Sequence, residues 1–594
     1  MDVLPFFLYL NMGPKIYNSS YPSLPVQSHS IFTHILSVDS SNSKVGGFPA
    51  EANAFVDTAT GYAITRRDLR SLALKFGYGL RHNPRVKAKR GDTILVYSPN
   101  SLAYPVFVLG AIAAGLRCTL ANNAYTPREL GHQYTNSGAN MIITTLESLA
   151  VALEMLKGLG MSHADAEKRV ILTTQSFAWV GGPATQESSK GLITFEQLLS
   201  LGELPEEERF DEEAAHETVL LCYSSGTTGQ PKGVETTHQN LTTEVNSIMA
   251  ALKYEEGDQL LVFLPFYHIY GAVSAFFYSL LCGATTVVMS GFDPIRFCVA
   301  VEKYRITAVL IVPPVLLAIA RHPAMDKYDL STIRLLFCSA APLPATLVKE
   351  GMERLLAKRK PEQALYITQG FGMTECSPAS HILPLDSSLS KMGSVGLLLP
   401  NFQARLVVDD GETVVDAEEG KSGEMWVRGP SVMKGYLNNP IANKNSLTAD
   451  RWYKSGDICV RDKDGYYYVE GRLKELIKYK GFQVPPAELE SVLINHPEVA
   501  DAAVIGIQSE QEATELPRAY VVHSQPEKIS TDESKKAFEK SVARWMESRV
   551  AKHKYLRGGV VVIKEVPRSA AGKILRIQLR ELAKKELEPV QSKL

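Results

Sequence analysis

A short run of residues in the first half of the chain has the composition of an anion-binding loop. From Tyr223 to Gly233 it reads Tyr-Ser-Ser-Gly-Thr-Thr-Gly-Gln-Pro-Lys-Gly, and the apolar stretch Val219–Cys222 before it is typical of a strand. Glycines let backbone N–H groups approach a phosphate closely, and Ser and Thr hydroxyls add donors. A flexible turn is the alternative for any short piece of this run, but the full eleven residues are more specific. The run is not a Walker A loop, because G-x-x-x-x-G-K-[ST] is absent.

A second segment, Tyr366–Glu375, could hold a nucleotide and a metal ion. It reads Tyr-Ile-Thr-Gln-Gly-Phe-Gly-Met-Thr-Glu. Glycines on both sides of Phe371 allow a planar ligand to approach, so this ring can stack on a base. Thr374 can donate to a phosphate, and the carboxylate of Glu375 can hold Mg²⁺ directly or through water. A tight turn between a strand and a helix is the alternative interpretation.

A third segment, Trp452–Asp457, ends in Ser-Gly-Asp. We expect an exposed carboxylate at Asp457, after a glycine turn, where it can accept hydrogen bonds from both ribose hydroxyls. An ordinary aspartate turn is the alternative, since Ser-Gly-Asp alone is common.

A fourth segment, Pro567–Ile574, carries a single lysine, Lys573, among small residues. Attack of a carboxylate on ATP brings two anions together, and a cation between them stabilises the charge on the transferring phosphoryl group. Lys573 has the right type for that task. A solvated surface lysine is the alternative.

The four segments occur in the order shown by the adenylate-forming superfamily, and the chain resembles that superfamily over nearly its whole length. Its members include acyl-CoA synthetases, firefly luciferase and peptide-synthetase adenylation domains. Leu264–Tyr270 and Gly471–Glu488 look like the 4-coumarate–CoA ligase group within it. The resemblance implies a carboxylic acid as substrate, ATP and coenzyme A as co-substrates, and Mg²⁺ as cofactor.

The resemblance also assigns roles to single residues. It implies that Lys573 bridges the acid carboxylate and the α-phosphate, that His268 gates the acyl pocket, and that Lys478 and Gln483 serve the thioester half-reaction. A plain core histidine is the alternative for His268. The implied ATP-binding residues are Ser224, Ser225, Gly226, Thr227, Thr228, Gly229, Lys232, Gln369, Gly370, Phe371, Gly372, Thr374, Asp457 and Arg472. The implied acyl pocket contains Tyr270, Ser274, Phe337, Ala340, Ala341 and Gly370; the hinge and CoA residues are Lys474, Lys480 and Gly481; the metal residues are Thr228 and Glu375.

Two positions depart from the coumarate ligase pattern. Those enzymes usually have Asp before the hinge arginine, where this chain has Gly471, so the orientation of Arg472 is open. Plant members usually carry Lys near the phenol end of the substrate, where Phe337 aligns here. A hydrophobic wall at that point favours an apolar acid.

The order of apolar runs indicates which elements position these residues. Strand-like runs such as Thr93–Tyr97 and Ala308–Val312 alternate with helical patterns such as Ser101–Ala114, which predicts α/β layers with mostly parallel strands. After about Asn401, short strand-like pieces separated by acidic, glycine-containing turns predict a small barrel-like β unit. We expect a large N-terminal domain, residues 1–471, that binds ATP and the acid. A smaller mobile α+β domain, residues 472–594, then carries the catalytic lysine.

Composition excludes several classes of protein. The net charge of -1 offers no global field for nucleic acid, and the seven scattered cysteines form no C-x-x-C pair, which fits a reducing compartment better than a disulfide scaffold. The apolar start lacks the basic region of a secretory signal. Between Asp258 and Asp293 there is no charged residue. This interval is long enough to span a bilayer, but its Pro and Gly residues favour a buried strand–helix–strand unit.

The last three residues are Ser592, Lys593 and Leu594. A free C-terminal S-K-L is read by the peroxisomal import receptor, so we expect this receptor as a partner and the peroxisome as the location.

The sequence therefore predicts an acid–thiol ligase that forms an acyl-adenylate and then an acyl-CoA thioester, in β-oxidation or specialised metabolism. A medium-chain fatty or aryl acid is the expected substrate. An enzyme that loads a carrier protein and a luciferase-like oxygenase remain alternatives. A non-enzymatic binding module is a more distant one, because the lysine, the glutamate and the phosphate loop are all intact.

Overall fold

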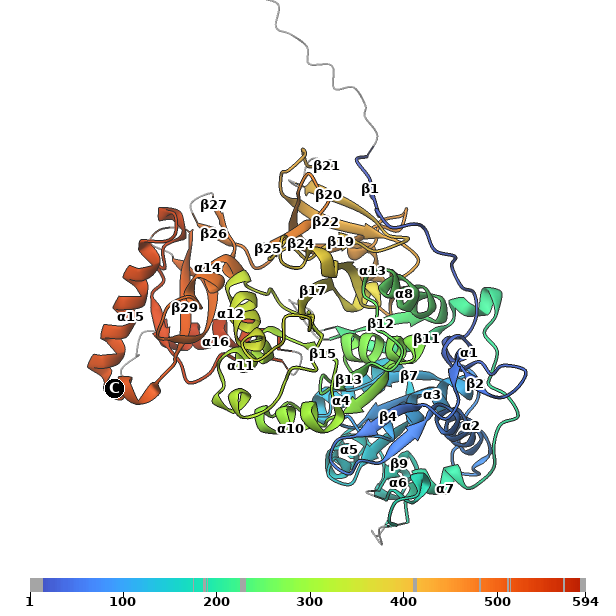
Figure 1. Cartoon of the computed structure of the whole chain (residues 1–594). Coiled ribbons are helices and arrows are strands. Elements are labelled where there is room, and N and C mark those ends of the chain that lie inside the picture. The colour runs from blue at the N-terminus through green and yellow to red at the C-terminus, as the bar shows by residue number, and fades with distance from the viewer. Residues whose placement is uncertain are drawn as a thin grey trace, which may run out of the picture.

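The computed structural model describes residues 14–174, 176–184, 189, 191–224, 231–409, 414–479, 482–509, 512, 514–569 and 572–587. Two large sheets form the N-terminal part, a third antiparallel sheet covers one side of them, and a smaller C-terminal part packs beside α11 and α12 (Figure 1). The α/β class with a large domain and a smaller C-terminal domain is as the sequence predicts.

The first large sheet has eight strands in the order β10-β9-β8-β6-β7-β11-β12-β23. It is parallel from β10 to β11, and the last two pairings are antiparallel. Its strands are β6 (Thr93–Tyr97), β7 (Arg117–Leu120), β8 (Ala139–Thr145), β9 (Val170–Thr173), β10 (Ile193–Thr194), β11 (Thr218–Ser224), β12 (Lys232–Thr237) and β23 (Gly435–Tyr436). Helix α2 (Arg66–His82) precedes these strands, and the helices between them are α3 (Tyr104–Ala113), α4 (Pro127–Ser137), α5 (Leu149–Gly158), α6 (His163–Lys168) and α7 (Phe195–Leu199).

Helix α4 illustrates how local sequence sets these boundaries. Thr126 and Glu129 form a capping box at its start, and Pro127 occupies the first turn, where a missing N–H has no cost. Gly138 ends the helix with a φ of 67°, a left-handed conformation that glycine adopts without strain.

The second large sheet has nine strands in the order β19-β18-β17-β16-β15-β13-β14-β4-β5, and it is parallel from β17 to β4. Its strands are β4 (Asn53–Asp57), β5 (Ala63–Thr65), β13 (Gln259–Val262), β14 (Thr285–Val288), β15 (Ala308–Ile311), β16 (Leu335–Cys338), β17 (Tyr366–Gly372), β18 (Ala379–Ile382) and β19 (Leu397–Leu398). Helices α1 (Ile31–Leu36), α8 (His238–Ala251), α9 (Tyr278–Cys282), α10 (Pro294–Tyr304), α11 (Pro313–Arg321) and α12 (Ala345–Leu356) belong to the same lobe, which also has the small hairpin of β2 (Lys44–Val45) and β3 (Phe48–Pro49).

The uncharged interval between Asp258 and Asp293 is a buried strand–helix–strand unit, as predicted. Strand β13 leads through a π-helix, Gly271–Phe277, and through α9 to β14. Every residue of the π-helix is buried. Among the residues that the structure describes, no helix is both long and apolar enough to cross a membrane.

The third sheet is antiparallel and takes the place of the expected barrel-like unit. It contains β1 (Tyr17–Asn18), β20 (Gln403–Asp409), β21 (Val414–Asp416), β22 (Gly423–Arg428), β24 (Tyr453–Arg461) and β25 (Tyr467–Arg472), and α13 (Pro440–Ser446) lies between β23 and β24. Strand β1 comes from an N-terminal arm that pairs with β20. The arm is also held by Leu24, whose N–H and C=O both bond to the Asn401 side chain at 2.9 Å.

The C-terminal part has its own core. Strands β28 (Val499–Ser509), β29 (Thr514–His523) and β30 (Val560–Val562) form a sheet, flanked by α14 (Pro486–Leu493), α15 (Asp532–Glu547) and α16 (Arg576–Leu587), with a hairpin of β26 (Ile477–Tyr479) and β27 (Phe482–Val484). The buried residues of the main core end at Tyr467, and those of the next core begin at Ile477. The expected boundary between 471 and 472 falls in this interval.

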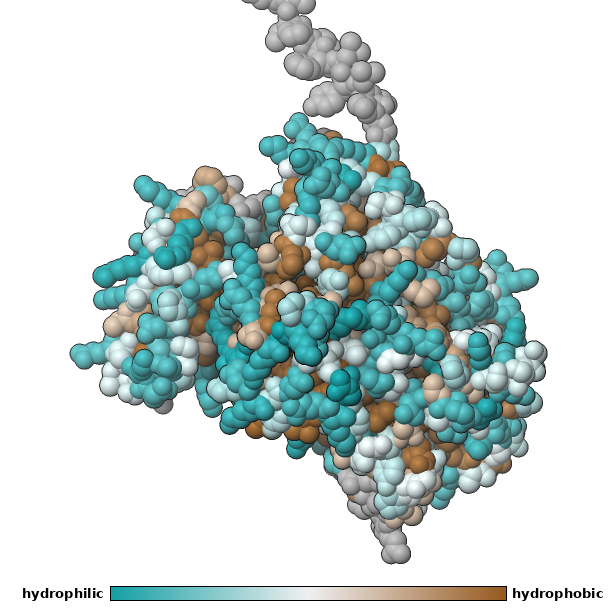
Figure 2. Space-filling model, in the orientation of Figure 1, coloured by the Kyte–Doolittle hydropathy of each residue, from teal (hydrophilic) through white to brown (hydrophobic). Residues whose placement is uncertain are grey.

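The surface is that of a protein with its apolar residues mostly inside. Figure 2 shows a face dominated by hydrophilic and neutral residues, with brown patches that are small and scattered. All seven cysteines are free and buried.

Candidate active site

The expected phosphate loop joins β11 to β12. Of its residues Ser225, Gly226, Thr227, Thr228 and Gly229 lie outside the described part of the chain, but the two ends of the loop are placed. Ser224 and Lys232 face each other as the last antiparallel pair of these strands. The hydroxyl of Ser224 is buried and has no hydrogen-bond partner among the described residues. The loop therefore begins and ends at the same end of two paired strands, β11 and β12.

The second segment forms the end of β17 and the turn that follows it. Gly370 has no room for a side chain, because a Cβ there would lie 2.7 Å from the Phe337 ring, and one at Gly372 would lie 2.1 Å from the Pro378 carbonyl oxygen. The glycines are thus needed for packing between strands as well as for ligand access. Gln369 is buried, and the Phe371 ring contacts His381 edge-on, with its ring centroid 6.0 Å away.

The segment that contains Ala340 and Ala341 lies beside Gly370. The Ser339 hydroxyl donates to the Gly370 carbonyl at 2.9 Å, and Ala340 has a φ of 73°. A left-handed conformation at a residue with a Cβ is strained, and such positions cluster at functional sites. The structure therefore brings two sequence-predicted segments to the carboxyl ends of β16 and β17.

Glu375 is held from two sides in the turn after β17. Its backbone carbonyl accepts from Met433 at 2.9 Å, and its Oε1 accepts from the Tyr436 hydroxyl at 2.8 Å. Lys232 Nζ lies 4.0 Å from the centroid of the Tyr436 ring. Burial lowers the pKa of Lys232, and the charge of Glu375 opposes that shift. The sequence analysis missed Tyr436, since Gly-Tyr carries no pattern that indicates a site.

Asp457 corrects one prediction. We expected an exposed carboxylate in a glycine turn, but Asp457 is only 4% exposed and lies within β24. Gly456, with a φ of 72°, interrupts the pairing of β24 with β22, and this irregularity turns the Asp457 side chain inward. Arg472 Nε donates to Asp457 Oδ1 at 3.1 Å. Burial raises the pKa of Asp457, and Arg472 and then Lys573 oppose that shift.

The lysine loop of the C-terminal part reaches this same site. Gly572, with a φ of 79°, packs so closely on the start of α11 that a Cβ there would lie 3.2 Å from the Val312 side chain. Arg568 fixes the loop, because it bonds to the Gly572 carbonyl at 2.9 Å and to Asp501 at 2.7 Å. Burial, followed by the charge of Arg472, lowers the pKa of Lys573 to about 8, although Glu475, Asp457 and Glu375 act to raise it.

His268 lies beside the lysine loop. Burial and then the charge of Lys573 lower the pKa of His268 to about 4, so its imidazole is neutral near pH 7. The Tyr270 N–H donates to Nδ1 of His268 at 3.3 Å, which places the ring proton on Nε2. A cavity of about 20 Å³ next to His268 is also lined by Thr374, Tyr223 and Gln133.

The expected acyl-pocket residues are closely packed. The Tyr270 hydroxyl donates to the Phe337 carbonyl at 3.0 Å, and the two rings meet at 6.1 Å between centroids. Ser274 is 3% exposed and lies in the π-helix. Such a local widening of a helix is frequent at functional sites.

Lys478, which is expected to serve the thioester step, is not brought to this site. Lys478 is exposed on β26, where its N–H donates to Glu515 at 2.7 Å and its carbonyl accepts from Thr514 at 2.7 Å. Lys480, Gly481 and the side chain of Gln483 lie outside the described part of the chain. Lys474 is exposed in the turn between the two parts, and its charge lowers the pKa of Lys232 after the larger effect of burial.

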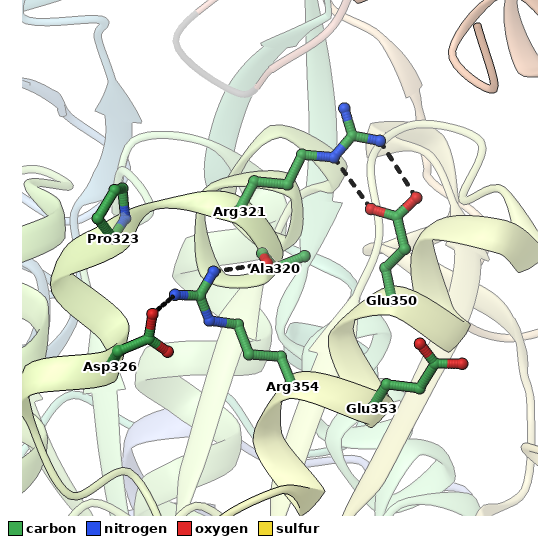
Figure 3. Close-up of a pocket in the computed structure, with 7 residues that line it drawn as sticks. All are labelled: Ala320, Arg321, Pro323, Asp326, Glu350, Glu353 and Arg354. Carbon is green, nitrogen blue, oxygen red and sulfur yellow. Dashed lines mark hydrogen bonds and ion pairs between the residues drawn. The ribbon is translucent and has the colours of Figure 1, made fainter. Parts of the chain in front are cut away.

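A surface hollow of about 480 Å³ lies between α11 and α12 and contains none of the predicted residues. Figure 3 shows that four of its five charged side chains are paired with one another, Arg321 with Glu350 and Arg354 with Asp326, while Glu353 stands apart from them. None of the sequence-predicted residues lines this hollow, so the site at the ends of β16 and β17 is the better candidate.

Comparisons with known proteins support the same family as the sequence motifs. Residues 43–437 match the family described as AMP-binding enzyme, and residues 488–573 match the AMP-binding enzyme C-terminal domain. Probable 4-coumarate–CoA ligase 1 of Dictyostelium discoideum is 36% identical over 507 residues, covering 84% of this chain and 87% of the relative. Probable CoA ligase CCL5 of Humulus lupulus is 32% identical over 584 residues, covering 98% of each.

Solved structures show the same architecture. The o-succinylbenzoate CoA synthetase of Bacillus subtilis, in complex with its acyl-adenylate intermediate, matches with a TM-score of 0.71 and 26% identity over 89% of this chain and 95% of that one. A benzoate CoA ligase from Burkholderia xenovorans matches in fold, with a TM-score of 0.76 and 22% identity over 93% of this chain and 99% of that one.

Proposed function

Because this chain belongs to the AMP-binding, adenylate-forming family and is an acid–CoA ligase, we propose that its two half-reactions are divided between two sets of residues. The family suggested by the four sequence segments, the fold and the ligase activity are all confirmed. The observation that carries our proposal is the burial of Lys573 beside Asp457, Glu375 and His268, with Lys478 exposed elsewhere.

In the first half-reaction, the acid carboxylate attacks the α-phosphorus of ATP, and the bond to pyrophosphate breaks. We propose that Ser224, Lys232 and the loop between them hold the phosphates, that Phe371 stacks on the base, and that Asp457 accepts from the ribose hydroxyls. Lys573 lies between the two anions and neutralises the charge that builds up as they approach. Its lowered pKa rises again when ATP is bound, since anionic phosphates favour the protonated form.

The carboxylate of Glu375 also fits a magnesium ion. Within the described part of the chain, Oε2 of Glu375 accepts no hydrogen bond, while Oε1 is fixed by Tyr436. No group of three or more His, Cys, Asp or Glu side chains is gathered among the described residues. The single carboxylate of Glu375 suits Mg²⁺, which is usually bound through one or two carboxylates plus substrate phosphates. Glu375 and the Thr228 hydroxyl would hold the ion, which supplies charge neutralisation on the phosphates.

The second half-reaction transfers the acyl group from the adenylate to the CoA thiol and releases AMP. We propose that the C-terminal domain, residues 472–594, rotates about Lys474 between the two steps. That rotation would withdraw Lys573 and bring Lys478 and Gln483 to the adenylate. The relatives are named as CoA ligases, which favours CoA over a carrier protein as acceptor.

We propose an apolar acid as the preferred substrate. The Tyr270 hydroxyl already donates to the Phe337 carbonyl, so its proton is not available to a phenolic hydroxyl of a substrate. Phe337 closes the same wall with a hydrocarbon ring, and a buried hydroxyl without a partner would cost about 1–3 kcal/mol. Medium-chain fatty acids and unhydroxylated aryl acids should therefore exceed 4-coumarate in kcat/KM. Discrimination among apolar acids is also limited to about 1–3 kcal/mol per methylene, so several of them should be turned over.

Incubation with ATP, CoA and a panel of acids tests these proposals. We expect acyl-CoA from apolar acids, with AMP and pyrophosphate as coproducts. Preferred turnover of hydroxycinnamates would refute the pocket argument, while an unloaded adenylate or light emission would point to a carrier protein or an oxygenase.

We further propose that the enzyme acts in the peroxisome, in β-oxidation or in a step of specialised metabolism. The proposal rests on Ser592-Lys593-Leu594, which lie outside the described residues. The import receptor reads this signal only with a free carboxyl end. Deleting the three residues should leave catalysis unchanged and move the protein to the cytosol. A diffuse distribution of an N-terminal fluorescent fusion with the tail intact would contradict the proposal.

A further inference from the structure

Tyr436 contacts two groups that we propose for the adenylation step, Glu375 and Lys232. Its hydroxyl donates to Oε1 of Glu375 at 2.8 Å, and its ring faces Lys232 Nζ at 4.0 Å from the centroid. The side chain is 2% exposed, so both contacts are made away from water. Charge-assisted hydrogen bonds and cation–π contacts are both stronger when desolvated.

The backbone of Tyr436 is fixed where those contacts require it. Strand β23 pairs with β12, and the Leu437 N–H donates to the Gly233 carbonyl at 2.8 Å, next to Lys232. The Asn443 side chain bonds to both the N–H of Tyr436 at 2.6 Å and its carbonyl at 3.0 Å. Tyr436 and the Lys232 end of the phosphate loop are thus held together by the pairing of β23 with β12.

The direction of the hydrogen bond follows from the surroundings. The Glu375 carboxylate can only accept, so the Tyr436 hydroxyl is the donor to its Oε1. The Tyr453 hydroxyl lies 3.4 Å from that of Tyr436. Since the Tyr436 proton is engaged with Glu375, Tyr453 is the donor of this second pair.

We propose that Tyr436 is a positioning residue for the metal–phosphate half of the site, a role that rests on the proposed functions of Glu375 and Lys232. By occupying Oε1, the hydroxyl leaves Oε2 as the carboxylate oxygen directed to the ion. By stacking under the ammonium group, the ring holds Lys232 toward the phosphates. Tyr436 therefore sets the distance between the Lys232 ammonium group and the Glu375 carboxylate, which must act on the same triphosphate.

The two functions of the side chain can be separated by two variants. Tyr436→Phe removes the hydroxyl and keeps the ring, and Tyr436→Leu removes both. Tyr467→Phe is the matched control, because Tyr467 is also buried but its hydroxyl has no hydrogen-bond partner among the described residues. Mn²⁺ binding is measured by electron paramagnetic resonance on the full chain with a non-hydrolysable ATP analogue, and pyrophosphate exchange gives the KM for the acid.

We expect Tyr436→Phe to weaken Mn²⁺ binding about tenfold, the size of one hydrogen bond to a charged group, with the KM for the acid unchanged. Tyr436→Leu should also weaken binding of the analogue measured without metal, and Tyr467→Phe should match the unmodified protein. If Tyr436→Phe behaves as Tyr467→Phe does while Glu375→Gln loses Mn²⁺, the positioning role is wrong and the proposed site stands. If Glu375→Gln keeps full Mn²⁺ binding, the proposed metal role itself fails.

Discussion

Two lysines of the C-terminal domain have opposite surroundings. Lys573 lies at the candidate active site, where burial lowers its pKa to about 8 and where Asp457, Glu375 and His268 are close enough to interact with its charge. Lys478 is exposed on a hairpin of the same domain, and the contacts found there are made by its backbone. The difference supports our proposal that this arrangement of the domains serves adenylation and that a second arrangement serves the thioester step.

Replacing Lys573 by Ala should have the largest effect. The adenylation rate should fall about 10²-fold to 10³-fold, the usual result of removing one group that stabilises transition-state charge. Thioester formation from supplied acyl-AMP should be retained. Pyrophosphate exchange and acyl-CoA release measure the two steps, and Lys540→Ala, an exposed lysine on α15, is the control. Equal loss of both steps would remove the distinction between the two lysines.

Lys478→Ala should show the opposite pattern. We expect overall turnover to fall about 10-fold to 100-fold, while pyrophosphate exchange stays near the unmodified rate, because Lys478 is not near the adenylation site. Gln483→Ala should behave in the same way. Exchange that falls as far as overall turnover would contradict the assignment of this hairpin to the second step.

The pH dependence of the two half-reactions should also distinguish Lys573 from Lys478. If the free enzyme needs Lys573 charged, kcat/KM for adenylation is maximal below the lysine pKa and falls about tenfold per pH unit above about 8. In Lys573→Arg the guanidinium keeps its charge, so the falling limb should disappear from the accessible range. The thioester step from supplied acyl-AMP should not share this limb. A limb that persists in Lys573→Arg would have to come from another group.

Glu475→Gln should have the smallest effect. Glu475 lies in the turn next to Lys474 and acts to raise the pKa of Lys573, while its Oε2 is 3.4 Å from Arg576 of α16. Removing the charge should move the basic limb of adenylation to lower pH, with only a few-fold loss in rate at pH 7. Glu488→Gln, which loses an ion pair with Lys554 outside the site, should leave the limb in place. An unchanged limb in Glu475→Gln would show that the turn and the lysine loop act independently.

Periodicity and motif order predicted most elements but not their long-range contacts. Thr93–Tyr97 was expected and found as a strand, and the strand expected at Ala308–Val312 is β15, which ends at Ile311. The helix expected at Ser101–Ala114 begins only at Tyr104. Within such elements, local preferences and burial agree, so the sequence alone is sufficient.

The site residues that sequence reasoning misjudged depend on partners far along the chain. Asp457 is buried because an irregularity in β24 turns it toward Arg472, fifteen residues later. Tyr436 reaches Glu375 only because β23 pairs with β12, which is about 200 residues away. A Ser-Gly-Asp turn and a Gly-Tyr pair look alike whether or not such a partner exists.

The N-terminal arm has a practical consequence for anyone who shortens this protein. Strand β20 has β1 and β21 along the same edge, and Val408, Val414 and Val415 beside it are each at least 44% exposed. A chain that starts after residue 28 would leave one end of β20 with unpaired N–H and C=O groups next to exposed valines. Such an edge can recruit a strand from another molecule. Trimming the arm would therefore expose a strand edge that can seed aggregation, while every proposed catalytic residue stayed in place.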